Sequence, residues 1–233
     1  LSQISHELRT PMTSIRAFSE ILTEGDLPAQ QVADYGRIIH DEAKRLTRLL
    51  DDLLDLSVLE NGTVQLNLGL AHLGQMLDRA EVAASQTRPD RAFRVERDVT
   101  AEEIYLKTDA DRLVQVFINL ISNARKYCDA DPALLRVLVR LKAGRVTIDF
   151  IDNGRGIPKE KQALIFEKFA RLTDQSRAGG AGLGLAICRE IMANLGGTVA
   201  YVPGQRGAAF RVTLPLRREQ AAESVHLSER KLA

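Results

Sequence analysis

The sequence predicts an α+β protein: a helical hairpin that forms a dimeric four-helix bundle, followed by a two-layer α/β sandwich with a mixed sheet. Over residues 1–60, apolar side chains recur every three or four positions, the period of an amphipathic helix. After residue 63, short alternating apolar and polar segments are interleaved with helical patterns, which indicates a sheet covered by helices. We therefore divide the chain into a hairpin over 1–62, an α/β domain over 63–216 and a polar tail over 217–233.

Two helices are expected in the hairpin, over residues 1–24 and 29–60, with a turn at 25–28 between them. Pro11 lacks a backbone N–H and should kink the first helix, and Asn61-Gly62 should end the second. The apolar stripe of the second helix is wider than one short partner helix can cover. Dimerisation into a four-helix bundle would cover it, and packing of the hairpin on its own α/β domain is the alternative.

In the second region, apolar residues that recur every three or four positions predict helices, and apolar residues that alternate with polar ones predict strands. Helices are expected over 70–85, 109–127 and 182–195, and strands over 64–68, 93–97, 104–106, 135–141, 146–150, 198–202 and 208–214.

Composition excludes several classes of function. Hydrophobic residues make up 45% of the chain, charged residues 27%, and the net charge is +1, so nothing favours a nucleic acid or an anionic membrane surface. Cys128 and Cys188 form no C-x-x-C pair, so neither a disulfide framework nor a zinc site is expected. No apolar run reaches the ~18 to 20 residues that span a bilayer, and no P-loop or dinucleotide fingerprint occurs.

His6 lies in Ser5-His6-Glu7-Leu8-Arg9-Thr10-Pro11 and is the first candidate for chemistry. A nucleophilic histidine presents a neutral ring nitrogen, and Glu7 could accept a hydrogen bond or a proton from the other nitrogen. Thr10 is four residues later, on the same helical face, where its hydroxyl could orient a water molecule. Taken alone, such a histidine is usually an ordinary surface residue, so its interpretation depends on the motifs downstream.

Asn119 and Asn123 are four residues apart within an otherwise apolar helix, so their amides share one face. Amides are costly there unless they have partners, which favours a function. Their oxygens are hard ligands suited to Mg²⁺, which bridges phosphate oxygens. A polar helix face or cap is the alternative.

Asp152 ends an apolar strand and begins Asp152-Asn153-Gly154-Arg155-Gly156-Ile157-Pro158. Its carboxylate could accept a hydrogen bond from the adenine amine, while Gly154 and Gly156 permit close approach of the backbone to the base. Further along, the segment with Gly180, Gly182, Leu183 and Gly184 opens a helix whose N-terminal amides can bind phosphate.

The order and spacing of these motifs resemble the catalytic core of a sensor histidine kinase, with a histidine phosphotransfer hairpin and a Bergerat-type ATP-binding domain. The resemblance covers roughly residues 1–216. It implies autophosphorylation of His6 with ATP and Mg²⁺, and phosphotransfer to an aspartate of a response-regulator receiver domain, with phosphatase activity toward that regulator as a further expectation.

The resemblance also implies roles for particular residues. Asn123 would hold the metal, Lys126 would meet a phosphate, and Tyr127 would lie near the sugar or phosphates. The segment 166–171 resembles a phenylalanine box in which Phe166 and Phe169 lie under an ATP lid over 172–181, and Arg171 reaches the phosphates. For the two phenylalanines, core packing remains an equal alternative. Ala181 departs from the family, which often has threonine there.

The partners implied are a second copy of the chain and a response regulator, with no nucleic acid. Membrane contact would come only through a sensor region outside this chain, which makes the chain the cytoplasmic portion of a bacterial membrane-bound sensor. Two alternatives stay open: a plain ATPase of the gyrase, chaperone and mismatch-repair group, and a phosphatase-dominant dimeric scaffold. His40, His72 and His226 have no comparable context.

Overall fold

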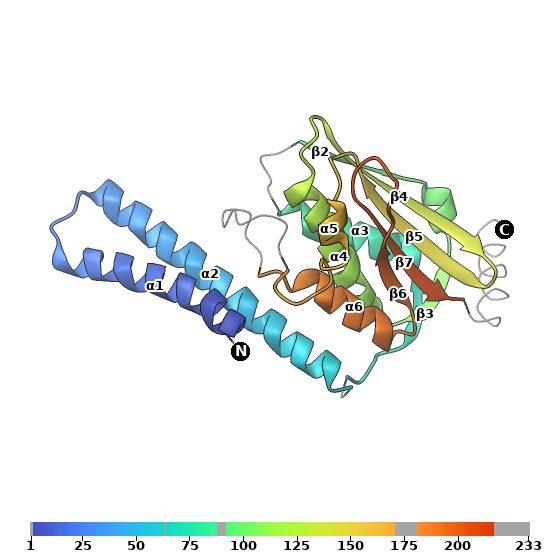
Figure 1. Ribbon diagram of the computed structural model, residues 1–233, viewed down its shortest axis with the longest axis horizontal. Helices are drawn as coiled ribbons and strands as arrows, with labels where there is room; N and C mark the ends of the chain where they lie inside the picture. Colours follow the sequence, from blue (N-terminus) through green and yellow to red (C-terminus); the bar gives the residue numbers. More distant parts are fainter. Residues whose placement is uncertain (1, 63, 88–91, 171–180, 217–233) are drawn as a thin grey trace.

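In the computed structural model, residues 2–62, 64–87, 92–170 and 181–216 are described (Figure 1). The first two helices, α1 (Ser2–Glu24) and α2 (Ala29–Glu60), form the predicted antiparallel hairpin. Helix α1 continues through Pro11. Near the turn the two helices meet through Phe18 and Tyr35, whose ring centroids are 5.2 Å apart.

The second region, called the sandwich, is built on a mixed sheet with the strand order β2-β4-β5-β7-β6, in which only the β2–β4 pairing is parallel. Helices α3, α4 and α6 lie on one face of the sheet (Figure 1). A small antiparallel pair, β1–β3, lies beside it. The bounds are β1 Gly69–His72, α3 Leu73–Ser85, β2 Phe93–Arg97, a 3₁₀ turn Val99–Glu102, β3 Tyr105–Thr108, α4 Ala110–Tyr127, β4 Ala133–Lys142, β5 Arg145–Asp152, α5 Lys159–Gln162, α6 Gly184–Asn194, β6 Thr198–Tyr201 and β7 Ala209–Pro215.

The core lies between the helices and the sheet. The apolar residues of α4 recur every three or four positions, so they share one face, and that face is buried in the core. From it, Phe117 packs against Phe150 of β5, with ring centroids 5.5 Å apart. Asp109 precedes α4 and accepts a hydrogen bond from the backbone N–H of Arg112 at 3.1 Å, which fixes where the helix begins. Because its start is fixed, α4 also holds its last turns, which carry Asn123 and Lys126, in a fixed position relative to the sheet.

One predicted element is wrong, and another begins later than predicted. Residues 64–68 form no strand, because the Asn67 N–H donates to the Asp109 carboxylate at 2.9 Å instead of to a neighbouring strand. The helix expected over 70–85 begins only at Leu73, since residues 69–72 pair with β3. His72 caps this helix by accepting a hydrogen bond from the Gln75 N–H at 3.2 Å.

The last part of α2 packs against the sandwich, whereas the rest of the hairpin extends away from it (Figure 1). Asp55 of α2 accepts hydrogen bonds from Arg112 at 2.9 and 3.1 Å and from Gln115 at 2.8 Å, both on α4. Leu56 and Leu59 are buried in the same region. Packing of the hairpin on its own sandwich therefore covers part of the apolar stripe.

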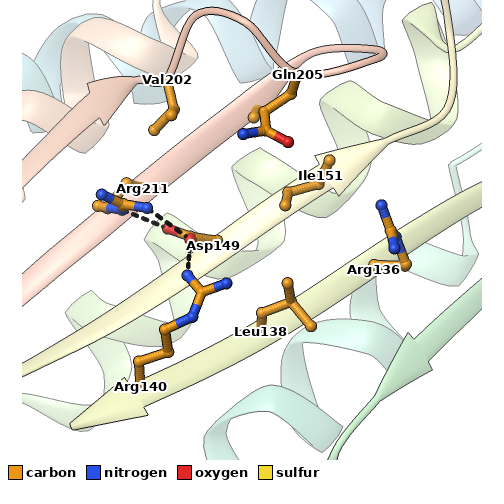
Figure 2. A pocket seen from close by; sticks show the side chains of 9 residues that line it. Arg136, Leu138, Arg140, Asp149, Ile151, Val202, Gln205 and Arg211 are labelled. Atoms are coloured by element: carbon orange, nitrogen blue, oxygen red, sulfur yellow. Dashed lines mark hydrogen bonds and ion pairs between the residues drawn. The ribbon is translucent and has the colours of Figure 1, made fainter.

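The other face of the sheet is polar. Strand alternation turns Asp149 away from the core residues Ile148 and Phe150, and Figure 2 shows its carboxylate between Arg140 and Arg211. The two arginines donate to it at 2.6 to 2.8 Å beside a hollow of about 140 Å³. Burial opposes ionisation of Asp149, but the two guanidinium groups outweigh it and lower its pKa. This network lies on the face opposite α4 and α6, apart from the candidate site.

Among the described residues, no helix has both the length and the apolar character that a membrane span requires.

Candidate functional site

His6 is exposed on α1, in the half of the helix farther from the turn. Thr10 lies one turn later, and its hydroxyl donates to the His6 carbonyl oxygen at 3.2 Å. Both residues line a shallow surface depression together with Arg9, Thr13, Ser14 and Ala17. The predicted grouping of an accessible imidazole and a hydroxyl on one helical face is therefore present.

Glu7 points toward α2 and is half-buried, in contrast to His6. Its Oε2 lies 4.0 Å from Nη2 of Arg45, and Nη1 of Arg45 lies 3.6 Å from the carboxylate of Glu42. Sequence reasoning did not find Arg45, because the contact depends on how the two helices face each other across the hairpin. The helical period alone could have placed Arg45 on the inner face of α2.

The end of α4 carries the predicted metal and phosphate residues. Asn119 lies against the start of α6, where a Cβ on Gly184 would come within 2.9 Å of its Oδ1. It also forms a hydrogen bond with the thiol of Cys188, whose pKa burial raises to about 12. Asn119 therefore helps to join α4 to α6, and Asn123 is the half-buried amide one turn further along.

Lys126 and Tyr127 complete this helix. Burial lowers the pKa of Lys126, Arg48 of α2 lowers it further, and Asp52 of α2 raises it. Tyr127 is exposed. In this arrangement the side chain proposed to meet a phosphate thus has charged groups of α2 as neighbours, which the sequence did not predict.

Asp152 is buried at the end of β5, and its Oδ1 accepts hydrogen bonds from the N–H groups of Gly154 at 2.9 Å and Ala208 at 3.0 Å. Its second oxygen accepts no bond from the described residues, so it is available to a ligand donor. Burial raises the pKa of Asp152, the two backbone bonds oppose this shift, and nearby Asp129 adds to it.

The glycines around Asp152 keep the backbone close. Gly156 has a φ of 76°, in the left-handed region that favours glycine, and a Cβ there would meet the Gly207 carbonyl oxygen at 3.0 Å. A Cβ on Gly207 would collide with the backbone of Asp152. Sequence reasoning missed the segment around Gly207. Its Gly204-Gln205-Arg206-Gly207 turn is a recognisable local signal, but its approach to Asp152 depends on the β5–β7 pairing.

Phe169 and Gly182, which come before and after residues 171–180 in the sequence, are in contact with each other. The Phe169 N–H donates to the Gly182 carbonyl oxygen at 2.9 Å, and a Cβ on Gly182 would lie 2.7 Å from the Phe169 carbonyl carbon. Phe169 has a φ of 64°, which is uncommon for a non-glycine residue. Predicted site residues Arg171 and Gly180 lie outside the described residues.

Leu183 and Phe166 are mainly packing residues. The Leu183 side chain is buried in the core just before α6, so any ligand contact would come from its backbone. Phe166 packs edge-on against Phe210, with ring centroids 6.3 Å apart, which favours the core-packing interpretation.

The side chains near the end of α4 also show how the expected magnesium ion could be held. Within the part of the chain that the structure describes, no group of three or more His, Cys, Asp or Glu side chains could hold a metal. Mg²⁺ commonly keeps several waters and takes one or two protein oxygens plus substrate phosphates. A single amide oxygen from Asn123 therefore fits a magnesium ion that arrives with a nucleotide.

Comparison with known families identifies the class of protein. Residues 1–62 match the family model of the His Kinase A (phospho-acceptor) domain. Residues 108–218 match the model of the histidine kinase-, DNA gyrase B- and HSP90-like ATPases. The chain belongs to the histidine kinases and contains their catalytic core.

Individual relatives support the same assignment. The sensor protein kinase WalK of Staphylococcus aureus is 36% identical over 225 residues, which cover 92% of this chain and 52% of that relative. In WalK of strain JH9 the same match covers 36% of the relative, so the chain spans about half or less of the relatives' length.

Solved structures agree as well. The histidine kinase AdeS of Acinetobacter baumannii has a TM-score of 0.73 at 25% identity, covering 91% of this chain and 98% of AdeS. Full-length ShkA in complex with AMPPNP has a TM-score of 0.67 at 26% identity, covering 92% of this chain and 45% of ShkA.

Proposed function

We propose that this chain transfers the γ-phosphoryl group of ATP to His6 and then passes it to an aspartate of a response-regulator receiver domain. One observation supports the proposal most strongly. The same chain carries an exposed histidine, His6, beside a glutamate on the hairpin, and a buried aspartate, Asp152, that backbone N–H groups already orient in the sandwich. A plain ATPase of the same nucleotide fold would have no use for the His6 hairpin.

The sandwich would bind the nucleotide. Oδ1 of Asp152 is already held by two backbone N–H groups, so Oδ2 would accept from the exocyclic amine of adenine and would disfavour guanine. Gly154 and Gly156 would leave room for the base. Asn123 would ligate Mg²⁺, and Lys126 would meet a phosphate. The metal ion, when bound, would neutralise charge that develops on the phosphates.

The hairpin would carry out the transfer. A neutral ring nitrogen of His6 would attack the γ-phosphorus, so a nitrogen–phosphorus bond forms as the bond to the ADP oxygen breaks. Glu7 would accept the proton from the other ring nitrogen as positive charge develops on the ring. Because His6 is exposed, both the nucleotide and a receiver domain could reach it in turn.

Incubation with γ-³²P-labelled ATP tests the proposal. His6→Ala should abolish acid-labile, base-stable labelling and leave ATP binding unchanged, because His6 is on the hairpin and the nucleotide residues are on the sandwich. His40→Ala is the matched control, since His40 is also exposed on a hairpin helix but has no equivalent of Thr10. Label that persists in the His6 variant would overturn the assignment.

Thr10 supports a second activity, dephosphorylation of the regulator. Its hydroxyl donates to the His6 carbonyl, which leaves its oxygen lone pairs exposed beside the histidine, where they could orient the attacking water. Thr10→Ala should lengthen the half-life of a phosphorylated regulator in the presence of ADP, while much of the autokinase rate is retained. An unchanged half-life would remove the water-orienting role. Since Thr10 precedes Pro11, the helical content of the variant is measured as well.

WalK is a sensor kinase and is longer than this chain. We therefore place the chain in a larger sensor protein, with the input region outside these residues and a second copy of the chain as partner.

A further inference from the structure

The face of the main sheet opposite α4 and α6 has an excess of basic side chains (Figure 1). Strand alternation and the pairing register place the residues of β2, β4, β5 and β7 that point to this side next to one another. They include six basic residues and two acidic ones, namely Arg94, Arg136, Arg140, Lys142, Arg145 and Arg211, with Glu96 and Asp149. Because the whole chain has 32 basic and 31 acidic residues, the excess is local to this surface, called the basic face.

Three of the six cations form no ion pair within the part of the chain that the structure describes. They are Arg136, Lys142 and Arg145, and all three are exposed. The other three pair with the two acids of the same face. Lys142 and Arg145 also lie directly opposite each other across the β4–β5 pairing, where like charges are destabilising. The described residues therefore leave the basic face with a net positive charge that an acidic partner would neutralise.

The centre of the basic face is the hollow of about 140 Å³ beside Asp149. Figure 2 shows Arg136 on one side of this hollow and the Asp149 group on the other, with Leu138 and Ile151 between them. Two guanidinium groups share the single carboxylate of Asp149, so this part of the lining is positively charged before Arg136 is counted. The hollow thus combines an apolar floor with a cationic rim.

We propose that the basic face is a docking surface for an acidic segment of a partner protein, and that a glutamate of the partner enters the hollow. The methylene groups of that glutamate would pack on Leu138 and Ile151, and its carboxylate would accept two hydrogen bonds from the guanidinium of Arg136. Neighbouring carboxylates of the segment would lie against Lys142 and Arg145. This surface is separate from the proposed phosphoryl transfer, because it lies on the side of the sheet opposite α4.

Two other classes of partner match this surface less well. Single-stranded nucleic acids are bound by aromatic side chains on which bases stack, and none of the residues of the described strands that point to this face is aromatic. Binding to an anionic bilayer is strengthened by apolar side chains that enter the headgroup boundary. On this face Ile151 is 7% exposed and Ala209 is 1% exposed, so these apolar groups are too deep to reach a bilayer. A hollow with an apolar floor instead suits a single protein side chain.

Fluorescence anisotropy tests the proposal with the whole chain and a short fluorescein-labelled peptide rich in glutamate, with a glutamine-rich peptide of the same length as the control probe. The glutamate peptide should bind more tightly, and its affinity should fall with added salt. Arg136→Ala should raise the dissociation constant about tenfold or more, because hydrogen bonds to charged groups are strong. Arg136→Lys should restore only part of the affinity, since an ammonium group cannot form the two-bonded pair. Lys107→Ala, at an exposed lysine of β3 outside the basic face, is the matched control and should have no effect.

Leu138→Trp tests the hollow itself, because the larger side chain fills the floor without changing the charge of the face. It should remove most of the affinity for the glutamate peptide, while circular dichroism and the rate of His6 labelling stay as in wild type.

Equal affinity for the two peptides would overturn the proposal, as would Arg136→Ala binding that is indistinguishable from wild type. Undiminished binding by Leu138→Trp would show that the hollow is not occupied, which also overturns it. Tighter binding to phosphatidylglycerol vesicles or to a single-stranded oligonucleotide, if lost in Arg136→Ala, would assign the basic face to one of those partners instead.

Discussion

The hairpin and the sandwich bury their apolar side chains to very different extents. In the sandwich, large side chains such as Phe117, Leu113 and Ile148 are completely buried between helices and sheet. In the hairpin, the buried leucines are Leu49, Leu56 and Leu59 of α2. Several large apolar residues of the hairpin remain exposed, namely Met12, Ile21, Val32, Leu50, Leu54 and Val58.

This difference indicates that a single copy completes the sandwich but leaves the hairpin incomplete. Isolated exposed apolar residues are normal on protein surfaces, but a series of them along two adjacent helices is typical of an interface. A second hairpin would cover them in a four-helix bundle, as the width of the apolar stripe predicts. The dimer is a proposal, and it predicts that mutations in the two regions have different effects.

The largest effect is expected from the sandwich core. Phe117→Ala removes a ring that is 0% exposed and contacts Phe150, so it should lower the free energy of unfolding by about 3–5 kcal/mol. Phe18→Ala removes a half-buried ring from the hairpin and should cost less than half as much. Urea unfolding of both variants measures the difference. Equal losses would mean that the hairpin is as well packed as the sandwich in a single copy.

The next largest effect concerns dimerisation. Leu54→Lys replaces a side chain that is 67% exposed on α2. A symmetric dimer carries this change twice, and burial of each leucine contributes about 1.5–3 kcal/mol, so the dimer dissociation constant should rise about 100-fold or more. Val82→Lys on α3, at a side chain 70% exposed, is the control. Sedimentation equilibrium measures both. An unchanged constant for Leu54→Lys would place the dimer interface elsewhere or remove it.

Nucleotide binding should depend strongly on Asp152 of the sandwich. Asp152→Asn places an amide where a carboxylate now accepts two backbone N–H bonds, so ATP affinity should fall by about 1–3 kcal/mol, roughly 5- to 150-fold. Asp111→Asn, at an exposed aspartate of α4, should have no effect. Calorimetric titration with ATP compares the two. Undiminished binding by Asp152→Asn would show that the adenine pocket is misplaced.

The smallest effect lies where the two regions meet. Burial raises the pKa of Asp52 to about 6, Asp55 and Asp51 raise it too, and Lys126 and Arg48 oppose them. When folding raises the pKa of an acid, the protein loses stability as the pH rises from the pKa of that acid in the unfolded chain to its pKa in the folded chain. Ionised Asp52 therefore destabilises the packed arrangement above pH 6, by about 1 kcal/mol once solvent screening is allowed for.

Asp52→Asn should consequently stabilise the chain at pH 8 and have a much smaller effect at pH 4.5. Urea unfolding at the two pH values measures this, with Asp41→Asn, at an exposed aspartate of α2, as the control. A gain that is the same at both pH values would mean that ionisation of Asp52 is not its cause.

Local sequence patterns predicted the elements whose signals are local. The bounds of α1, α2 and α4 agree with the structure within a residue or two, because each helix has a long apolar period and α4 begins at the cap residue Asp109. The alternating pattern was misleading at residues 64–68, since an extended segment can alternate half-buried and exposed side chains without strand pairing. The histidine kinase family is confirmed by the two matching family models.

The candidate site could be predicted only as separate motifs. His6, Asn123 and Asp152 stand out in the sequence because each belongs to a distinctive short segment. The groups that orient them do not, because Ala208 reaches Asp152 from 56 residues away and Arg45 approaches Glu7 from the other helix. Such contacts follow from tertiary packing, which no local period encodes. The functional roles of these residues remain predictions.

Helix α4 takes part in two contacts at once. Arg112 near its start bonds to Asp55 of α2, and Lys126 near its end is close enough to Asp52 to be influenced by its charge. If phosphate and α2 compete for Lys126, their binding is thermodynamically linked. If packing of the sandwich on α2 lowers the affinity for the nucleotide by some factor, bound nucleotide must lower the equilibrium constant for that packing by the same factor. Measuring how either equilibrium shifts when the other interaction is present then gives the coupling factor that applies to both.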